Sequence, residues 1–511
     1  MRNENKPKRD HARHQKRRLG VWTALAALAL VPAVGQAHES DGSRPTQAVA
    51  VEGQVAPGTG GQRFDPAGPS MMLTSAPMDG IGDVGFEEPR VNEDGNVAFI
   101  ASYGHVPIPA PALSPLDLIL FCPGAGVFGW DKTDDALFPI AISGQLTPVG
   151  ILPEGEDNYV GLTFNDKEQV AFAVRNIAPL LLPNSPVLEA PAVDGPVADG
   201  PVGPPLPHNA LFEGRKTTPL KVLAKSGDHV PGGGFFDDFY GVSMNQRGDV
   251  AFLASYWDLG GAAGVFLKRQ GKDVEAIARS GELLPDTGGG RLCTETLDGL
   301  EGPWINDDGV VLFQAYCIRG GVPGLQGSIF MKRPHHSLER FVLIGDPVAG
   351  GGFVRAIWIG EPGVNNQEAA MRIQMGYEHV APNVITPVLY PEEVVATKKL
   401  DGHHKPAACA SLGDDLGFGF QLGYFEGAPT IDRDDQMGFV GVAAQALDPY
   451  HVVFTCKDDD LQAWAVEGDP KPVPGGATYG ELGDESNGCK HIVWVDETRY
   501  PTGVFTTKTH R

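Results

Sequence analysis

The sequence has no apolar stretch long enough to cross a membrane as a helix. Its longest one, residues 21–34, has about 14 residues, whereas a spanning helix needs about 20. Eight basic residues come before this stretch, and a small-residue site ending at Ala37 follows it. This order is typical of a cleaved signal peptide. We therefore expect residues 1–37 to direct export, by the Sec or the twin-arginine route, and residues 38–511 to lie in the periplasm or outside the cell.

Positive charge is also scarce. The chain has 40 basic against 64 acidic residues and a net charge of −24. Residues 1–37 hold eight basic and two acidic residues, so the rest of the chain carries a charge of −30. Such a surface repels phosphate backbones and anionic lipids, which argues against nucleic acid as a partner. A glycan, a protein or a small molecule remains open as the ligand, and we expect a monomer.

Cysteine is rare, and no two cysteines have Cys-x-x-Cys spacing. This disfavours zinc and redox sites, whereas an even number in an exported chain favours disulfides. Cys293 and Cys317 flank the core of one repeat and are the pair that we predict. The pairing of the other four stays open; they are Cys122, Cys409, Cys456 and Cys489.

Recognisable catalytic motifs are missing as well. The sequence has no Gly-x-Ser-x-Gly elbow, the motif that exposes a nucleophilic serine. Ser226 and Ser280 each precede Gly-Asp or Gly-Glu, but they recur at the same point of a repeat, which indicates a structural role. No catalytic residue and no cofactor are predicted.

What the sequence does have is an internal repeat, which is the strongest evidence of architecture. Its consensus is an asparagine and a glycine three positions apart, followed by Val-Ala-Phe. Successive copies begin 55 to 80 residues apart. Four clear copies span residues 92–99, 165–172, 245–252 and 306–313, and three weaker ones span residues 365–372, 432–439 and 487–494.

Each repeat predicts four short strands. Runs rich in Val, Phe and Ile that are bounded by turn residues are typical of strands, and asparagine and glycine suit the tight turn between the first two. Residues 47–54 resemble a fourth strand with nothing before it, whereas the last repeat ends after three. We therefore predict an all-β, seven-bladed β-propeller over residues 38–511, in which the N-terminal strand completes the C-terminal blade. Six or eight blades, or an open β-solenoid, are the alternatives. A Pro-rich insertion falls at residues 177–208.

The repeat resembles that of exported bacterial proteins named for the pattern Asn-x-x-Gly-x-x-Ala-Phe, the "choice-of-anchor" repeat proteins. Residues 92–99 and 245–252 match the pattern fully, whereas Glu168 replaces the glycine and Leu312 the alanine in two other copies. The resemblance covers about residues 47–505. It implies export and a repeat architecture, and it implies no activity.

Two acidic clusters are candidates for a metal site. Hard cations such as calcium take six to eight oxygen ligands from loops of this kind, although neither cluster has the spacing of an EF-hand. The candidates are Asp432, Asp434, Asp435, Asp458, Asp459 and Asp460.

Three functions fit these observations. The first is an exported binding or interaction protein, because propellers present many loops around one axis. The second is an exported hydrolase or lyase that acts on a glycan or a lactone, and the third is a structural component of the cell envelope. Fold alone does not decide among them.

Overall fold

The computed structural model divides the chain at residues 43 and 44, and the residues that it describes all lie in the second unit, residues 44–511. The predicted signal peptide, residues 180–207 of the predicted insertion, Cys122, Cys489, Asp458 and Asp459 lie outside the described residues. The described residues are 46–51, 53–64, 86–104, 124–155, 158–179, 208–257, 261–293, 300–360, 363–376, 392–417, 420–445, 448–457, 460–470, 479, 482–488, 491–496 and 503–507.

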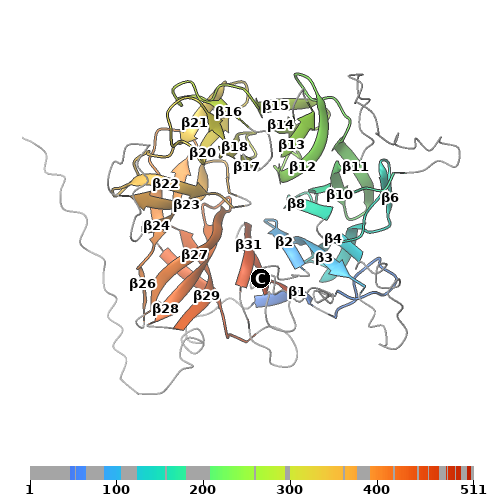
Figure 1. The fold of residues 1–511 in the computed structure, drawn as a ribbon. Helices are drawn as coiled ribbons and strands as arrows, with labels where there is room; N and C mark the ends of the chain where they lie inside the picture. Colours follow the sequence, from blue (N-terminus) through green and yellow to red (C-terminus); the bar gives the residue numbers. More distant parts are fainter. Residues whose placement is uncertain are drawn as a thin grey trace, which may run out of the picture. The chain divides into compact units, whose positions relative to one another are not determined.

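Antiparallel sheets of four or five strands make up almost all of this part (Figure 1). Six of them each use consecutive stretches of the chain. The first sheet has β2 (Phe86–Val91), β3 (Val97–Tyr103), β4 (Gly124–Asp131) and β5 (Ala136–Ile142). The second has β8 (Tyr159–Phe164), β9 (Val170–Val174), β10 (Ala210–Arg215) and β11 (Thr218–Lys225). The third has β12 (Phe235–Met244), β13 (Val250–Trp257), β14 (Ala262–Lys268) and β15 (Val274–Arg279).

The remaining sheets repeat this order. The fourth has β17 (Leu300–Ile305), β18 (Val311–Ala315), β20 (Ser328–Lys332) and β21 (Leu338–Val342). The fifth has β22 (Phe353–Trp358), β23 (Glu368–Gly376), β24 (Glu392–Lys399) and β25 (Ala407–Ser411). The sixth has β26 (Asp415–Gly417), β27 (Phe420–Ile431), β28 (Met437–Gln445), β29 (Asp448–Lys457) and β30 (Asp460–Val466). Two-stranded sheets form from β6 (Leu146–Thr147) with β7 (Gly150–Ile151), and from β16 (Arg291–Leu292) with β19 (Ile318–Arg319).

A composite sheet joins the two ends of the chain. β1 (Thr46–Val51) pairs antiparallel with β33 (Gly503–Thr507), and the sheet continues through β32 (His491–Asp496) to β31 (Leu482–Gly488). The N-terminal strand therefore completes the C-terminal sheet, as the sequence predicts. Because this pairing covers what would be an edge of the last sheet, it removes an exposed row of backbone donors and acceptors.

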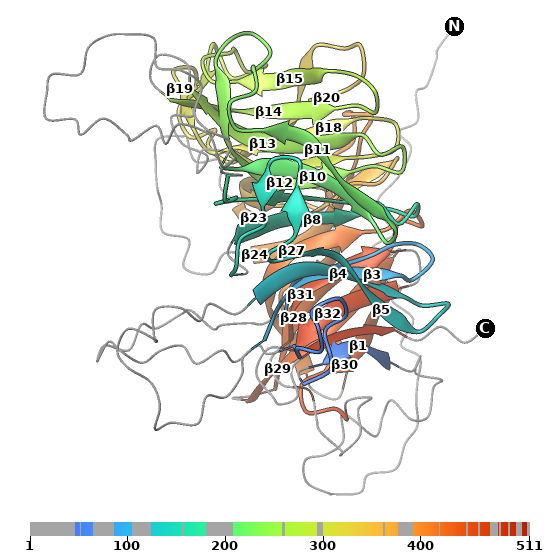
Figure 2. The ribbon, with the colours of Figure 1, turned by 90° about the vertical axis from the view of Figure 1, so that its right-hand side faces the viewer.

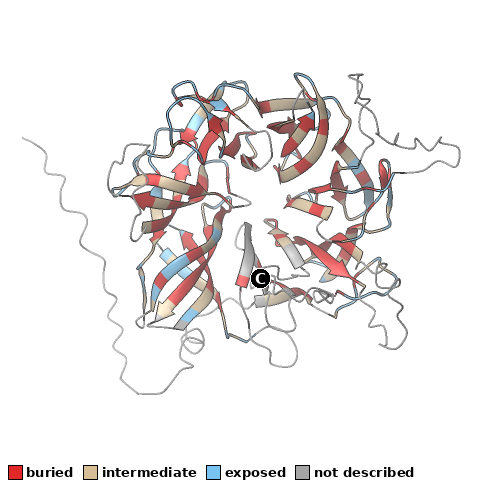
Figure 3. Ribbon diagram, viewed as in Figure 1, coloured by how far each residue is buried: buried red, intermediate tan, exposed pale blue. Residues whose placement is uncertain are grey.

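The sheets follow one another around a central axis, which confirms an all-β β-propeller (Figures 1 and 2). The first strands line the axis: β2 packs against β8, β8 against β12 and β12 against β17, and β31 packs against both β27 and β2. The core lies between neighbouring sheets (Figure 3). A single sheet could not bury both of its faces, so each one depends on its neighbours.

The repeated Val-Ala-Phe segment explains the second strand of each clear repeat. In β3 and β9 every side chain of the strand is buried. The motif phenylalanine stacks on a phenylalanine of the third strand; in the third sheet, the ring centroids of Phe252 and Phe266 are 5.7 Å apart. Such aromatic pairs add to the free energy gained by burying apolar area.

Strand direction gives the ring two different ends. The turn between the first and second strands carries the Asn-x-x-Gly motif, and we call this end the motif end. In the sixth sheet β27 is counted as the first strand, because β26 is an additional short strand before it. The second strand then runs to the opposite end, where it connects to the third strand and where the fourth strand passes to the next sheet. We call that opposite end the corner end. Antiparallel order fixes this assignment for every sheet.

Two disulfides are present in the described part of the chain. Cys293–Cys317 confirms the predicted pair, with Cα atoms 5.2 Å apart. Cys409–Cys456 joins β25 of the fifth sheet to β29 of the sixth. The sequence left this second pairing open, because only the packing of two sheets brings these strands together. No helix among the described residues is long and apolar enough to cross a membrane.

Candidate functional site at the motif end of the ring

In the five repeats that begin at residues 92, 165, 245, 306 and 365, the motif asparagine closes its own turn. The side-chain Oδ1 of Asn245 accepts a hydrogen bond of 2.9 Å from the backbone N–H of Asp249, four residues on. Asn92 does the same for Asn96, and Asn306 for Val310, at 2.9 and 2.8 Å. This is the turn-forming role that the sequence predicts, because a short amide side chain can satisfy nearby backbone donors.

The same asparagines also bond to the next sheet. Asn165 Nδ2 donates to the backbone carbonyl of Asn245 at 3.1 Å, and Asn245 Nδ2 donates to the carbonyl of Asn306 at 3.0 Å. Asn306 continues the series to Asn365, and Asn365 donates to the carbonyl of Asp432. A carboxamide can do both tasks because it has an acceptor and two donors. The motif asparagine therefore links neighbouring sheets as well as forming a turn.

The residue after each asparagine forms a second tier. The backbone N–H of Glu93 donates to Asp166 Oδ1 at 2.9 Å, and that of Asp166 donates to Gln246 Oε1 at 2.7 Å. Gln246 and Asp307 donate in the same way, to Asp307 and Asn366, at 2.8 and 2.9 Å. This tier explains why an oxygen-bearing side chain follows the motif asparagine in these copies. It also gathers several carboxylates close to the axis.

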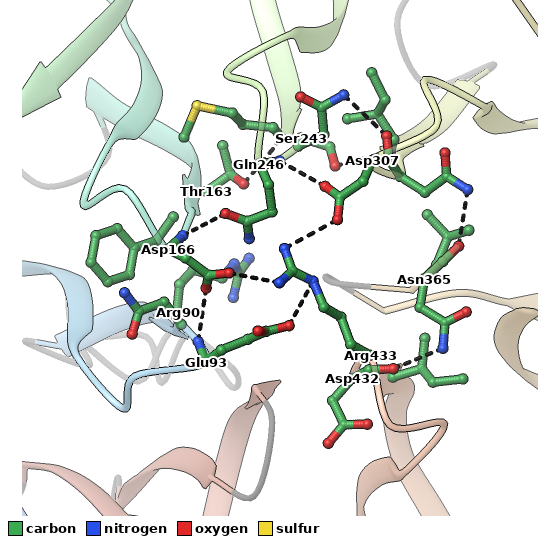
Figure 4. A pocket seen from close by; sticks show the side chains of 18 of the residues that line it. Arg90, Glu93, Thr163, Asp166, Ser243, Gln246, Asp307, Asn365, Asp432 and Arg433 are labelled. Atoms are coloured by element: carbon green, nitrogen blue, oxygen red, sulfur yellow. Dashed lines mark hydrogen bonds and ion pairs between the residues drawn. The ribbon is translucent and has the colours of Figure 1, made fainter. Parts of the chain in front are cut away.

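Arg433 holds these carboxylates together (Figure 4). Arg433 follows Asp432, which takes the place of the asparagine in the sixth repeat. Its guanidinium forms ion pairs with three residues that occupy the equivalent position in three other sheets. The N–O distances are 2.6 Å to Glu93 Oε1, 3.0 Å to Asp166 Oδ2 and 3.1 Å to Asp307 Oδ2. One planar, multidentate cation can satisfy several acceptors in this way.

Burial and mutual repulsion act on this cluster. Burial raises the pKa of Glu93, the nearby Asp166 raises it further, and Arg433 opposes both effects. Burial likewise raises the pKa of Asp166, against the hydrogen bond from Glu93 and the charge of Arg433. Removing a carboxylate from water disfavours its charged form. Arg433 therefore stabilises the charged form of these acids, whereas burial favours their protonated form.

The cavity around Arg433 is small, and several of its lining side chains are hydrogen-bonded to neighbouring sheets. Its volume is about 100 Å³, and Thr163 and Ser243 are among its lining residues. Both hydroxyls accept backbone hydrogen bonds from the next sheet, Thr163 from Met244 and Ser243 from Ile305. These hydroxyls therefore serve as acceptors between sheets. The arrangement as a whole neutralises charge and joins sheets.

Of the predicted metal candidates, Asp432, Asp434 and Asp435 lie on the turn between β27 and β28, where Asp432 also lines the cavity, and Asp460 begins β30. Asp432 Oδ1 accepts hydrogen bonds from the backbone of Asp434 and Gln436, and Asp435 Oδ1 accepts one from Asn365. Asp460 accepts a hydrogen bond from Gln462 in β30. No group of three or more His, Cys, Asp or Glu side chains that could hold a metal is found in the described part of the chain. A calcium site thus stays a prediction.

Sequence reasoning missed Arg433 and its three partners. All four occupy the position directly after the motif asparagine or its replacement. A usable signal was present, because among the copies that begin at residues 92, 165, 245, 306, 365 and 432 only the sixth has a basic residue there.

Comparison with known proteins gives fold-level similarities and one family. The propeller domain of the trilobed protease from Pyrococcus furiosus is 9% identical, with a TM-score of 0.43 over 83% of this chain and 95% of that chain. An ulvan lyase is 8% identical, with a TM-score of 0.36 over 83% and 93%. A gluconolactonase from Xanthomonas campestris is 11% identical, with a TM-score of 0.28 over 68% and 84%. No curated protein shows significant similarity to the sequence. A family model described as "Family of unknown function (DUF7453)" matches residues 205–489, which is more than half of the chain, and the protein therefore belongs to this family.

Proposed function

We propose that this protein is an exported β-propeller that binds a partner through the corner end of its ring. We count its six consecutive sheets and the composite sheet as seven blades. The two disulfides support export, because structural disulfides persist in oxidising compartments.

One observation carries the proposal. Of the large apolar side chains in the described residues, eight are exposed, and strand order assigns all eight to the corner end. Four belong to the corners after a fourth strand, three lie at or beyond the end of a second strand, and one lies in the half of β27 nearer the corner end. They are Val55, Leu146, Ile151, Trp257, Leu283, Tyr316, Val322 and Tyr424. Single exposed apolar residues are ordinary on a protein surface, whereas large contiguous apolar patches mark interaction sites; we take the one-sided distribution of these eight residues to favour an interaction face at the corner end.

The motif end is less suited to a partner. Its central cation, Arg433, is already paired with three carboxylates, and its hydroxyls and amides join neighbouring sheets. A ligand would have to displace these bonds to gain its own. The corner end presents side chains whose apolar surface is still open to water.

The test compares binding by two surface variants. The first is Val55→Ser/Trp257→Ser/Leu283→Ser at the corner end; the matched control, Lys167→Ser/Asp308→Ser, changes exposed turn residues at the motif end. Both should keep the wild-type melting temperature, because surface substitutions usually change stability by about 0.5 kcal/mol or less. Immobilised glycans, peptides and small molecules are then screened against all three proteins.

We expect any ligand of the wild type to be retained by the control and lost by the corner-end variant. Retention by the corner-end variant would refute the proposal. So would chemical conversion of a bound glycan or lactone, since that result would make the protein an enzyme.

A further inference from the structure

Three of the exposed apolar side chains at the corner end are aromatic. Trp257, Tyr316 and Tyr424 have 57%, 37% and 45% of their surface exposed. They come from the third, fourth and sixth sheets. Tryptophan and tyrosine are enriched in the centres of protein interfaces, because they bring large area at low cost in conformational entropy.

A carboxylate from the first strand of the sheet accompanies each of the two tyrosines. Tyr316 Oη donates to Glu301 Oε2 at 2.5 Å, and Tyr424 Oη donates to Glu426 Oε1 at 3.0 Å. Glu301 pairs across its sheet with Gln314, and Glu426 pairs with Val440. Each cross-strand partner lies eight residues after the first residue of its motif, so the two glutamates occupy equivalent positions.

The surroundings hold these groups in place. Burial and the Glu301 carboxylate raise the pKa of the Tyr316 hydroxyl, so it remains a donor. Glu426 is also 3.0 Å from His451 Nε2, and the other ring nitrogen of His451 is 2.9 Å from Glu467 Oε2. A carboxylate and an aromatic ring are thus presented together, with their geometry fixed by hydrogen bonds.

Two of the chain's own arginines already pack on aromatic side chains of the third sheet. The Arg175 guanidinium lies 3.9 Å from the ring centroid of Tyr240, and that of Arg279 lies 4.9 Å from Tyr256. Arg175 is also 3.4 Å from an Asp238 carboxylate oxygen. A guanidinium between a ring face and a carboxylate gains both cation–π and ionic attraction.

From this pattern we infer that the corner end binds an arginine- or lysine-rich segment of a partner protein, whose cations pack on Trp257, Tyr316 and Tyr424 and pair with Glu301 and Glu426. The inference rests on the proposed function and names its ligand class. The net charge of −30 on residues 38–511 complements such a segment and would speed its association. A nucleic acid or an anionic polymer would meet repulsion instead.

The probe is a fluorescein-labelled octa-arginine peptide, with binding followed by fluorescence anisotropy on the full chain. Glu301→Gln/Glu426→Gln and Trp257→Ala/Tyr316→Ala/Tyr424→Ala are the test variants. Asp94→Asn/Asp308→Asn is the matched control, because it removes the same charge from exposed turns at the motif end. We expect each test variant to bind about tenfold more weakly, from the combined loss of cation–π and ionic contacts, while the control changes less than about twofold, as a distant exposed charge should.

Equal weakening in the two charge variants would overturn the inference, because the attraction would then be only that of a negative protein. So would binding no tighter than that of a labelled Gly-Ser octapeptide. Corner-dependent binding of a neutral polysaccharide, with no binding of octa-arginine, would overturn the cationic partner but leave the proposed function standing. The melting temperature of each variant is measured beforehand to establish that it is folded.

Discussion

Asn245 Nδ2 donates a hydrogen bond of 3.0 Å to the backbone carbonyl of Asn306, the equivalent asparagine of the next repeat, 61 residues later. Asn245 is almost completely buried, and its Oδ1 closes the turn of its own repeat. One side chain thus combines a local and a long-range task. The recurrence of asparagine at this position in successive repeats therefore has a physical reason beyond turn formation.

Asn245→Ala should lower the free energy of unfolding by about 2–4 kcal/mol, because it leaves buried backbone groups in two sheets without partners. Asn366→Ala is the control: its side chain is exposed and accepts one hydrogen bond, from Asp307. We expect that loss to stay below about 1 kcal/mol. Denaturant unfolding measures both, and similar losses would contradict a special role for the motif asparagine.

Arg433→Ala should destabilise the protein most at neutral pH. Without the guanidinium, Glu93, Asp166 and Asp307 repel one another, and the loss should be about 1–3 kcal/mol at pH 7. Burial already raises the pKa of Glu93 and Asp166, so the folded state binds protons more readily than the unfolded state. Stability contributed by these acids therefore rises as the pH falls toward their ordinary range.

The deficit of the Arg433→Ala variant should consequently shrink between pH 7 and pH 5, as measured by denaturant unfolding at both values. Asp166→Asn in the same chain should recover part of the loss at pH 7 by removing one of the repelling charges. A deficit that stays constant with pH, with no recovery in the double variant, would show that Arg433 acts by packing alone.

Removal of residues 1–51 should destabilise the entire ring. This truncation takes away β1, including the buried Val49 and Ala50, and exposes the edge of β33. We expect a loss of at least about 3 kcal/mol, as for other large deletions from a core. Removal of residues 1–43 alone leaves β1 in place and should not alter the melting temperature. If the two truncations melt alike, the pairing of β1 with β33 does not close the structure.

The two disulfides should contribute differently to the free energy of unfolding. Cys409–Cys456 closes a stretch of 47 residues, and Cys293–Cys317 closes one of 24. Because loop-closure entropy rises by about 0.6 kcal/mol for each doubling of length, Cys409→Ser/Cys456→Ser should cost more than Cys293→Ser/Cys317→Ser by about that amount. Each loss should fall at about 2–5 kcal/mol. Calorimetry of the two double variants decides, and a larger cost for the shorter loop would contradict the entropic account.

Much of the fold could be predicted because its signals are local and repeated. The turn of residues 92–96 and the strand Val97–Tyr103 are encoded by a few neighbouring residues, and the same pattern recurs at residues 245–252. The unpaired strand near the N-terminus of the chain and the last repeat, which has only three strands, also predicted how the ring closes. Cys293 and Cys317 belong to the same repeat, so their pairing could be anticipated from their positions.

The candidate site could not be predicted in this way, because its contacts cross between sheets. Arg433 forms ion pairs with residues that lie 340, 267 and 126 positions earlier in the chain. The sequence around Arg433 does not predict that Glu93, Asp166 and Asp307 are its partners. Cys409 and Cys456, from two different sheets, are a second example. The sequence by itself determined the repeating strands, the turns and the composite closure, since hydrophobic patterning and turn chemistry act over a few residues. Only the tertiary structure decided which polar groups meet at the axis and which aromatic rings remain exposed at the corner end, because these depend on how sheets distant in sequence pack around a common centre.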